Sequence, residues 1–316
     1  MANTQGSIQK PLSLEPEEYS VGWICALPIE LTAAIAMLDA HHGPLKSQPK
    51  DDGNNYTLGS IGGHNVVMIC LPQYGTNEAA VAGMSMLRTF SNLRFGVMVG
   101  IGGGIPSPEN DIRLGDVAVS VPSGQAGGVI QHDMGKKEDG GFRRTGSLNR
   151  PPTVVLTAIA TLEATRNIGR QITTIVDGAF QEEEDEEWKF PEKEKDILFE
   201  DSNEPLSDRV QGDRIVPRGE RKSKHPRCFY GNIGSGNSVI KNAKKRNRLA
   251  SEEGIICVEM EAAGLMNFFN CTVIRGICDY ADAHKHKRWQ RYAASVAASY
   301  TKMLLRIISL QALKGQ

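Results

Sequence analysis

Apolar runs and polar stretches alternate along most of the chain, and their spacing predicts its elements. Short apolar runs predict strands at residues 19–27, 56–61, 65–71, 95–99, 116–121, 230–233, 255–258 and 272–278. Apolar positions at helical spacing predict helices at residues 30–38, 79–90, 153–167, 262–269 and about 289–310. Strands that alternate with helices are typical of an α/β protein. We therefore predict a single domain with three α/β/α layers around a central mixed, twisted sheet.

Two parts of the chain depart from this alternation. Residues 1–18 are polar, which predicts a flexible N-terminal tail ahead of a folded domain at 19–312. Within that domain, residues 182–187 are all acidic, residues 218–227 are rich in basic side chains, and the periodicity between them is poor. Such charge runs are typical of solvated chain. We predict an exposed, partly disordered insertion at about 181–227.

The composition narrows the classes of function. The chain has 316 residues with 36 Lys and Arg against 37 Asp and Glu, and so lacks the basic excess that nucleic-acid binding needs. No apolar segment reaches the roughly 18 residues of a membrane helix, and the N-terminus holds no apolar block of a secretory signal. The six cysteines form no C-x-x-C pair, and most lie in apolar runs where reduced, buried thiols belong. We expect a cytoplasmic protein with no nucleic-acid partner and no membrane association.

Four polar or glycine-rich features lie just past the carboxyl ends of predicted strands. They are Glu30, the glycine-rich stretch at 100–104, the pair Glu259 and Glu261, and Asp279. In α/β proteins ligands bind at that end of the sheet. We therefore predict that these features line a ligand site.

Each feature has a chemical and a structural interpretation. Glu30 is placed to act as a general base on water, or to stabilise a helix N-terminus. The stretch at 100–104 brings backbone N–H groups to a ligand or forms a tight turn, and it matches neither a dinucleotide fingerprint nor a phosphate loop. Glu259 and Glu261 point the same way in an extended chain, which suits the two hydroxyls of a ribose, although both also fit a helix start. Asp279 is placed to act as an acid near neutral pH, or to cap the next turn.

A metal site is a weaker interpretation of one further group. Asp282, His284 and His286 have an alternate spacing that allows metal ligation, but solvated turn residues show the same pattern. We predict no metal ion and no organic cofactor.

Five motifs in a fixed order resemble a known family. In sequence order the chain carries A-L-P-I-E at 26–30, G-I-G-G-G at 100–104, G-S-G-N at 234–237, V-E-M-E-A-A-G at 258–264 and G-I-C-D-Y-A-D at 276–282. This set resembles the purine nucleoside phosphorylase / uridine phosphorylase superfamily. Within it the chain is more similar to the methylthioadenosine/S-adenosylhomocysteine nucleosidase branch, and most similar to fungal members, some of which precede signalling NTPase domains. The resemblance covers about 19–310, interrupted by the insertion.

The resemblance implies roles for the polar motif residues. Glu30 matches the carboxylate that activates the attacking water, and Asp279 matches the acid that protonates or hydrogen-bonds N7 of the departing purine. Glu261 matches the acid that binds the ribose hydroxyls, and Met260 matches the side chain that packs on the sugar.

The resemblance also implies which residues surround the base. Gly102 and Gly103 match the glycines that line base and sugar, and Val239 and Ile240 fall where the branch packs against the base. The chain departs from the family at two of these places. It carries Val239 where an aromatic residue is common, and Cys278 where a Ser is common beside the acid.

Water, rather than phosphate, is the expected nucleophile. Phosphorylases of the superfamily hold phosphate with one Arg after the first strand and another just ahead of the central glycines. This chain has no Arg before Arg88, carries Met98 at the second place, and has the negative Glu30 in the first loop. We therefore predict a purine nucleosidase that hydrolyses the N-glycosidic bond of adenosine, with other purine ribonucleosides as further candidate substrates.

Three alternatives stay open. Basic residues at 221–227 and 284–288 favour adenine nucleotides such as AMP or ATP, because cations bind 5′-phosphates. The other two are a phosphate-dependent phosphorylase and a sensor that binds a nucleoside without cleaving it. The resemblance also implies a homo-oligomer, a dimer or larger, whose neighbours complete the active site. We expect a stand-alone enzyme, since the chain stops soon after its last predicted helix.

Overall fold

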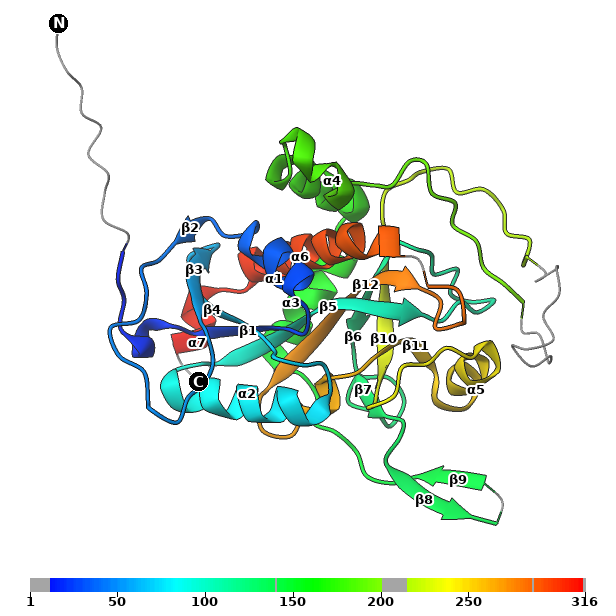
Figure 1. Cartoon of the computed structure of the whole chain (residues 1–316), viewed down its shortest axis with the longest axis horizontal. Coiled ribbons are helices and arrows are strands. Elements are labelled where there is room, and N and C mark those ends of the chain that lie inside the picture. Colours follow the sequence, from blue (N-terminus) through cyan, green and yellow to red (C-terminus); the bar gives the residue numbers. More distant parts are fainter. Residues whose placement is uncertain (1–11, 140, 201–214, 286, 315–316) are drawn as a thin grey trace, which may run out of the picture.

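The computed structural model describes residues 12–139, 141–200, 215–285 and 287–314 (Figure 1). Its strands are β1 (Val21–Cys25), β2 (Ala40–His41), β3 (Thr57–Ile61), β4 (His64–Cys70), β5 (Phe95–Gly104), β6 (Val117–Ser120), β7 (Val129–Gln131), β8 (Gly135–Glu138), β9 (Gly141–Arg144), β10 (Cys228–Ser235), β11 (Ile255–Glu259) and β12 (Cys271–Asp279). Its α-helices are α1 (Pro28–Ile35), α2 (Thr76–Thr89), α3 (Thr153–Glu163), α4 (Ile168–Ala179), α5 (Ala243–Glu253), α6 (Gln290–Ile307) and α7 (Leu310–Lys314). Its 3-10 helices include η1 (Pro16–Glu18), η2 (Glu183–Trp188), η4 (Ala262–Gly264) and η5 (Lys287–Trp289).

A mixed sheet forms the centre of the described part of the chain. Its ten strands run in the order β11-β10-β6-β12-β5-β1-β4-β3-β2, with β7 paired to β10. β5 is parallel to β1 and β12, whereas β6 runs antiparallel to β12 and β11 antiparallel to β5. Because β11 also pairs with β10, one half of the sheet closes on itself. The predicted mixed sheet is confirmed.

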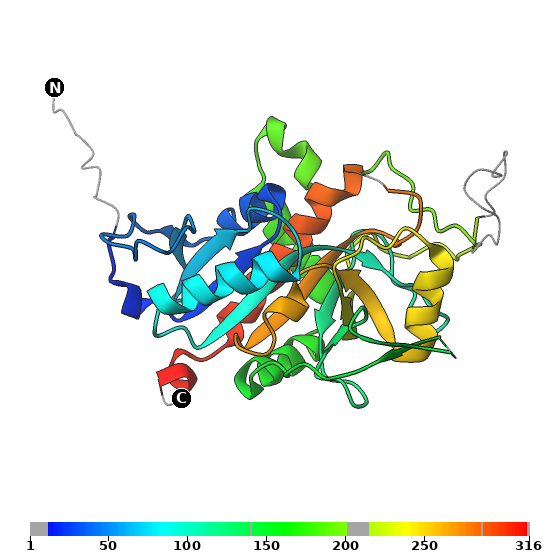
Figure 2. The ribbon, with the colours of Figure 1, turned by 60° about the horizontal axis from the view of Figure 1, so that its bottom comes forward.

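Helices cover both faces of this sheet. α6 packs on β12 and β5, and α1, α3 and α4 pack against α6, while α2 lies on the opposite face in Figure 1. α5, yellow in Figure 2, lies beside β11. The layers approach closely: a Cβ atom at Gly276 of β12 would lie 1.9 Å from the carbonyl oxygen of Ala293 in α6. The three-layer α/β/α architecture that the sequence predicts is confirmed.

The glycine-rich stretch is the end of the central strand and not a turn. β5 continues to Gly104 because its backbone pairs with β12 up to Gly103 and with β11 at Gly103 and Gly104. Gly103 is the register partner of both Asp279 and Val258. The carboxyl ends of three strands therefore meet at one point of the sheet.

The helix predicted at 262–269 is a single 3-10 turn, η4, followed by further turns. The backbone N–H of Ala262 donates to the Glu259 carboxylate, which bends the chain at the end of β11. Gly264 lies against α2, where a Cβ atom would be 1.9 Å from the Thr76 carbonyl oxygen. Contacts with distant parts of the chain therefore override the helical spacing.

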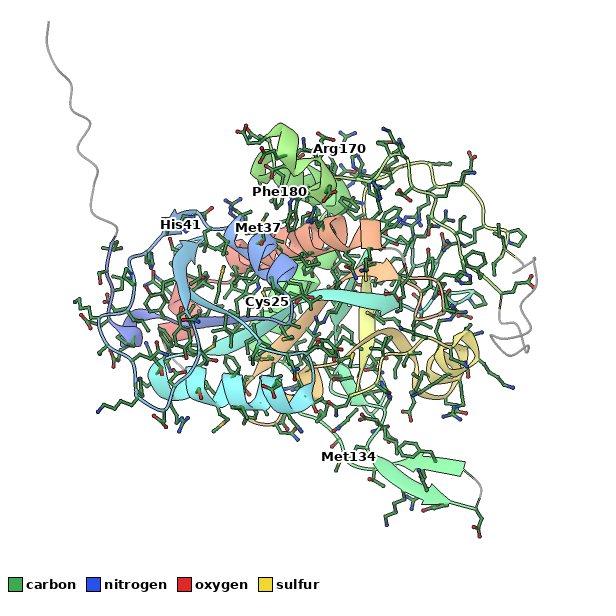
Figure 3. All side chains as sticks on the ribbon, in the orientation of Figure 1. Cys25, Met37, His41, Met134, Arg170 and Phe180 are labelled. Carbon is green, nitrogen blue, oxygen red and sulfur yellow. The ribbon has the colours of Figure 1, made fainter. Side chains whose placement is uncertain are left out.

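Other elements differ in extent or were not predicted. The helix expected at 153–167 ends at Glu163, and α4 begins after Asn167, whose φ of 61° lies in the left-handed region. The apolar pattern did not predict α4, α5, β2 or β7, nor the hairpin of β8 and β9 that projects from the domain in Figure 1. Met134, labelled in Figure 3, lies at the base of this hairpin and is 57% exposed.

The described part of the predicted insertion packs on the domain. Trp188 is 9% exposed, and its ring stacks on that of Phe180 with 5.0 Å between centroids. Phe190 makes edge contacts with the rings of Trp289 and Tyr292 at the start of α6. Most described side chains of the acidic run are exposed, whereas the aromatic side chains on either side of it are buried and anchor the segment on the domain. Residues 201–214 of the insertion lie outside the described residues.

Ion pairs tie the basic end of the insertion to the domain. Arg221 Nη1 lies 2.7 Å from Asp116, and Arg218 Nη1 lies 3.8 Å from Asp111. Arg218 also donates to the hydroxyl of Tyr280 at 2.8 Å. Because Tyr280 directly follows Asp279, the insertion contacts the loop that follows β12.

Residues 1–11 of the predicted tail lie outside the described residues, and residues 16–18 form η1. Across the described ranges, we find no helix with both the length and the apolar character to span a bilayer.

Candidate active site

A cavity of about 430 Å³ opens where β1, β5, β11 and β12 end. Figure 3 labels Cys25, the last residue of β1, beside α1 at this end of the sheet. All nine residues that the sequence assigns to a site line the cavity, namely Glu30, Gly102, Gly103, Val239, Ile240, Glu259, Met260, Glu261 and Asp279. The structure thus brings together site residues that lie up to 249 positions apart in the sequence, from Glu30 to Asp279.

Backbone N–H groups hold the Glu30 carboxylate. Oε2 accepts from Ala26 at 2.7 Å and from Leu27 at 3.0 Å, and Oε1 accepts from Ile101 at 2.8 Å. The carboxylate lies against β5, where a Cβ atom at Gly100 would be 2.2 Å from Oε1. Any side chain at position 100 would displace it.

The local sequence explains how Glu30 reaches this place. Pro28 opens α1, where its missing N–H is not needed. Glu30 is the third helical residue, and from there its side chain folds back to the free N–H of the N-cap residue. The helix-terminus interpretation and the site interpretation therefore describe the same carboxylate.

Arg275 of β12 joins three carboxylates. Its Nη2 lies 2.5 Å from Glu259 and 3.0 Å from Glu261, and its Nη1 lies 3.8 Å from Glu30. None of the four side chains is more than 5% exposed. Burial raises the pKa of Glu30 and of Glu261, and the Arg275 guanidinium opposes that rise. The cluster keeps an excess of acidic groups out of water.

The two carboxylates of the V-E-M-E motif have different sets of hydrogen-bond donors. Glu259 accepts from the N–H groups of Glu261 at 3.1 Å and Ala262 at 3.0 Å, in addition to Arg275. Glu261 accepts from Met260 N–H and from Arg275 on its Oε2 atom, and no described residue donates to its Oε1. Glu259 therefore fixes the loop, whereas Glu261 keeps one oxygen for a ligand.

Three donors surround the Asp279 carboxylate. Oδ1 accepts from Ala281 N–H at 2.8 Å and from the Lys285 ammonium at 2.6 Å. The Cys278 thiol lies 3.4 Å from Oδ2 and 3.6 Å from the carbonyl oxygen of Gly102. Burial and the Asp279 charge raise the pKa of Cys278, which keeps the thiol protonated as a weak donor. Ala281 has a φ of 52°, a strained conformation of the kind found at functional sites.

Basic and apolar side chains complete the lining. Lys241, Lys285 and Lys287 line the cavity and are exposed residues, in contrast to the buried carboxylates. Tyr74 is 58% exposed and Val239 49% exposed. Tyr74 thus supplies an aromatic ring to the cavity that Val239 also lines.

Arg275 and the pairing of Lys285 were not predicted from the sequence. Arg275 is a charged residue inside the apolar run at 272–278, and a buried Arg needs carboxylate partners, so this interruption was the available signal. Lys285 lies in the basic run at 284–288, in which no spacing distinguishes one lysine from the next.

The residues of the metal alternative do not form a ligand cluster where they are described. Asp282 accepts from the backbone N–H of His284, whose ring stacks on Phe199 at 3.7 Å, while His286 lies outside the described residues. In the described ranges no group of three or more His, Cys, Asp or Glu side chains could hold a metal ion.

Comparison with known sequences identifies relatives along nearly the whole chain. The family model of the phosphorylase superfamily matches residues 20–309. A nucleotide-binding leucine-rich repeat (NLR)-like protein from the fungus Hyaloscypha variabilis is 76% identical over 99% of this chain and 32% of its own length. This chain therefore spans about a third of that relative. A 5′-methylthioadenosine/S-adenosylhomocysteine nucleosidase from Mycobacterium tuberculosis is 25% identical over 92% of this chain and 96% of its own.

Solved structures share the fold at low identity. A Helicobacter pylori 5′-methylthioadenosine/S-adenosylhomocysteine nucleosidase has a TM-score of 0.58 and 15% identity, covering 91% of this chain and 98% of its own. Futalosine hydrolase from the same organism has a TM-score of 0.55 and 16% identity, covering 91% and 97%. At these identities the likeness shows the fold alone.

Proposed function

The chain belongs to the phosphorylase superfamily, as its motifs indicated, and from this premise we propose that it is a purine nucleosidase. In this proposal it hydrolyses the N-glycosidic bond of adenosine to adenine and ribose, using side chains alone. The observation that supports it most is that Glu30, Glu261 and Asp279 line one cavity. The match to a curated nucleosidase over 92% of the chain favours the same bond type.

Each carboxylate has a proposed role in the reaction. Asp279 gives a proton to N7 of the purine as the bond between C1′ and the base breaks. Glu30 takes a proton from the water that adds to C1′, and Glu261 accepts hydrogen bonds from the ribose hydroxyls. Groups in such acid and base roles typically supply about 10²–10⁴-fold each in rate.

The charge of the Arg275 cluster favours water over phosphate. Arg275 faces three carboxylates with both terminal nitrogens, so its guanidinium is not free to clamp a phosphate ion. Three carboxyl groups around one guanidinium leave no free cation for a phosphate ion, and the ionised ones stabilise the positive charge that the ribose gains as the base leaves. Arg275 therefore supports hydrolysis.

A second candidate substrate class is favoured by the lysines. Lys241 and Lys287 line the cavity, and no acidic side chain of the described residues pairs with either. Ammonium groups are common partners of phosphate. AMP and ATP are therefore the alternative to adenosine, cleaved by the same three carboxylates.

A homo-oligomer and a cytoplasmic location are also part of the proposal. The resemblance to the family supports the oligomer. The exposed Tyr74 and Val239 at the cavity support it too, because exposed apolar groups at a site are often covered by a partner.

A substrate panel tests the proposed function. We expect the purified protein to release free base from adenosine, AMP or ATP faster than from uridine, inosine, guanosine and methylthioadenosine, measured by chromatography of the base. Calorimetric binding of adenosine without base release would instead show a sensor. Release of uracil in preference to adenine would contradict the purine assignment.

A further inference from the structure

Lys285 forms an ion pair with Asp279, the carboxylate that the proposed reaction uses as its acid. Its ammonium lies 2.6 Å from Asp279 Oδ1, and Asp279 is its single ion-pair partner among the described residues. This ion pair engages the carboxylate that the proposed reaction directs at N7 of the purine. The pair therefore has to open before Asp279 can serve the base.

Asp279 does not depend on Lys285 for its position. The Ala281 N–H and the Cys278 thiol contact the two carboxylate oxygens from the chain next to Asp279 itself. Arg246 holds the same loop from α5, donating to the carbonyl oxygen of Tyr280 at 3.1 Å. The carboxylate would therefore keep its orientation if the ammonium moved away.

Lys285 has room to move, unlike its partner. Its side chain is 32% exposed, whereas that of Asp279 is 11% exposed. A lysine ammonium sits on a flexible four-carbon stem and can exchange one anionic partner for another.

The cavity allows Lys285 to exchange partners because its acidic and basic side chains lie in different parts of the lining. Glu30, Glu259 and Glu261 surround Arg275 at the buried end, whereas Lys241, Lys285 and Lys287 belong to the exposed lining. Asp279 is the one lining carboxylate of the described residues outside the Arg275 cluster. An anionic group of a ligand at the exposed part would meet three ammonium groups.

We propose that Lys285 is a positioning residue that leaves Asp279 for the 5′-phosphate of the substrate. In the structure it pairs with Asp279, and with a nucleotide bound it pairs with phosphate and frees the acid for the purine. The inference rests on the proposed function, since it takes Asp279 as the acid. A phosphorylated substrate then speeds its own cleavage, and adenosine, which has no phosphate, leaves the pair intact.

Lys285→Met tests this because it should change different kinetic constants for the two substrates. We expect wild-type protein to have a higher kcat for AMP than for adenosine. In Lys285→Met, kcat for adenosine rises toward that for AMP, whereas AMP keeps its kcat and loses affinity, so that the AMP-to-adenosine ratio of kcat drops by roughly tenfold or more, the range for losing a hydrogen bond to a charged group. Lys285→Arg keeps the charge and should keep the ratio. Lys244→Met, an exposed lysine of α5 outside the cavity, is the matched control.

Several outcomes would overturn the inference. Equal losses for both substrates in Lys285→Met would show a general role in catalysis or folding, and an unchanged ratio would show no role in this choice. A wild-type protein with a higher kcat for adenosine than for AMP would also overturn the Lys285 inference, while leaving the nucleosidase proposal in place. No base release from either substrate would overturn the nucleosidase proposal as well.

Discussion

Glu30 shows how a single residue can be tuned by the fold around it. Three backbone N–H groups fix its carboxylate, so its position does not depend on the rotamer of another side chain. Burial raises its pKa above the ordinary value, and a stronger base takes a proton from water more readily. Gly100 makes this placement possible, because any side chain there would overlap the carboxylate.

Replacement of the proposed acid and base should separate catalysis from stability. We expect Glu30→Gln and Asp279→Asn each to lower kcat for adenine release by roughly 10²–10⁴-fold. Because burial raises the pKa of Glu30 above its unfolded value, keeping it ionised at neutral pH lowers the stability of the folded state. Glu30→Gln removes this cost but replaces one accepting oxygen with an NH2 group that faces a backbone N–H, so we expect a folded protein with at most a modest fall in the thermal midpoint. Near wild-type turnover in either variant would refute the assigned roles.

For single residues, the sequence predicted which polar side chains lie at strand ends but not which side chains they pair with. Glu30 and Asp279 follow apolar runs, which placed them at the ligand-binding edge. That Arg275 would join Glu30 depends on two strands becoming parallel neighbours of β5, and no local spacing encodes that pairing.

At the scale of elements, local periodicity predicted most strands and helices but not their extents. A tight turn was one of two interpretations of the glycines at the end of β5, since glycines favour turns. This stretch is a strand because β12 and β11 pair with it from either side, and these contacts join residues far apart in the chain. The apolar run at 262–269 was misread as a helix for a related reason, since the Glu259 carboxylate and α2 bend the chain there.

The acidic insertion has an anchor that can be tested by mutation. Trp188 stacks on Phe180 and is nearly buried, so Trp188→Ala should lower the free energy of unfolding by about 3 kcal/mol, as for other large-to-small core substitutions. The measurement is the thermal midpoint, with Glu184→Gln as the control, since Glu184 is exposed in the same acidic run. An unchanged midpoint for Trp188→Ala would show that the segment is only solvated chain.

At the scale of the whole molecule, the closed half of the sheet determines where chemistry can occur. β5, β11 and β12 end together, and β1 brings Glu30 to the same place. The resulting cavity has a buried acidic end and an exposed basic lining, a polarity that suits a ligand with a sugar at one end and an anion at the other. The near-neutral total of charges in the sequence gave no sign of this separation.

The nature of the nucleophile is the most direct test of this mechanism. Adenine release from adenosine, or from AMP if that is the better substrate, is measured in phosphate-free buffer and again with added phosphate. The sugar product is identified by mass spectrometry. We predict free ribose, or ribose 5-phosphate from AMP, at a rate that phosphate does not raise. A strict requirement for phosphate, with a sugar 1-phosphate as the product, would contradict it.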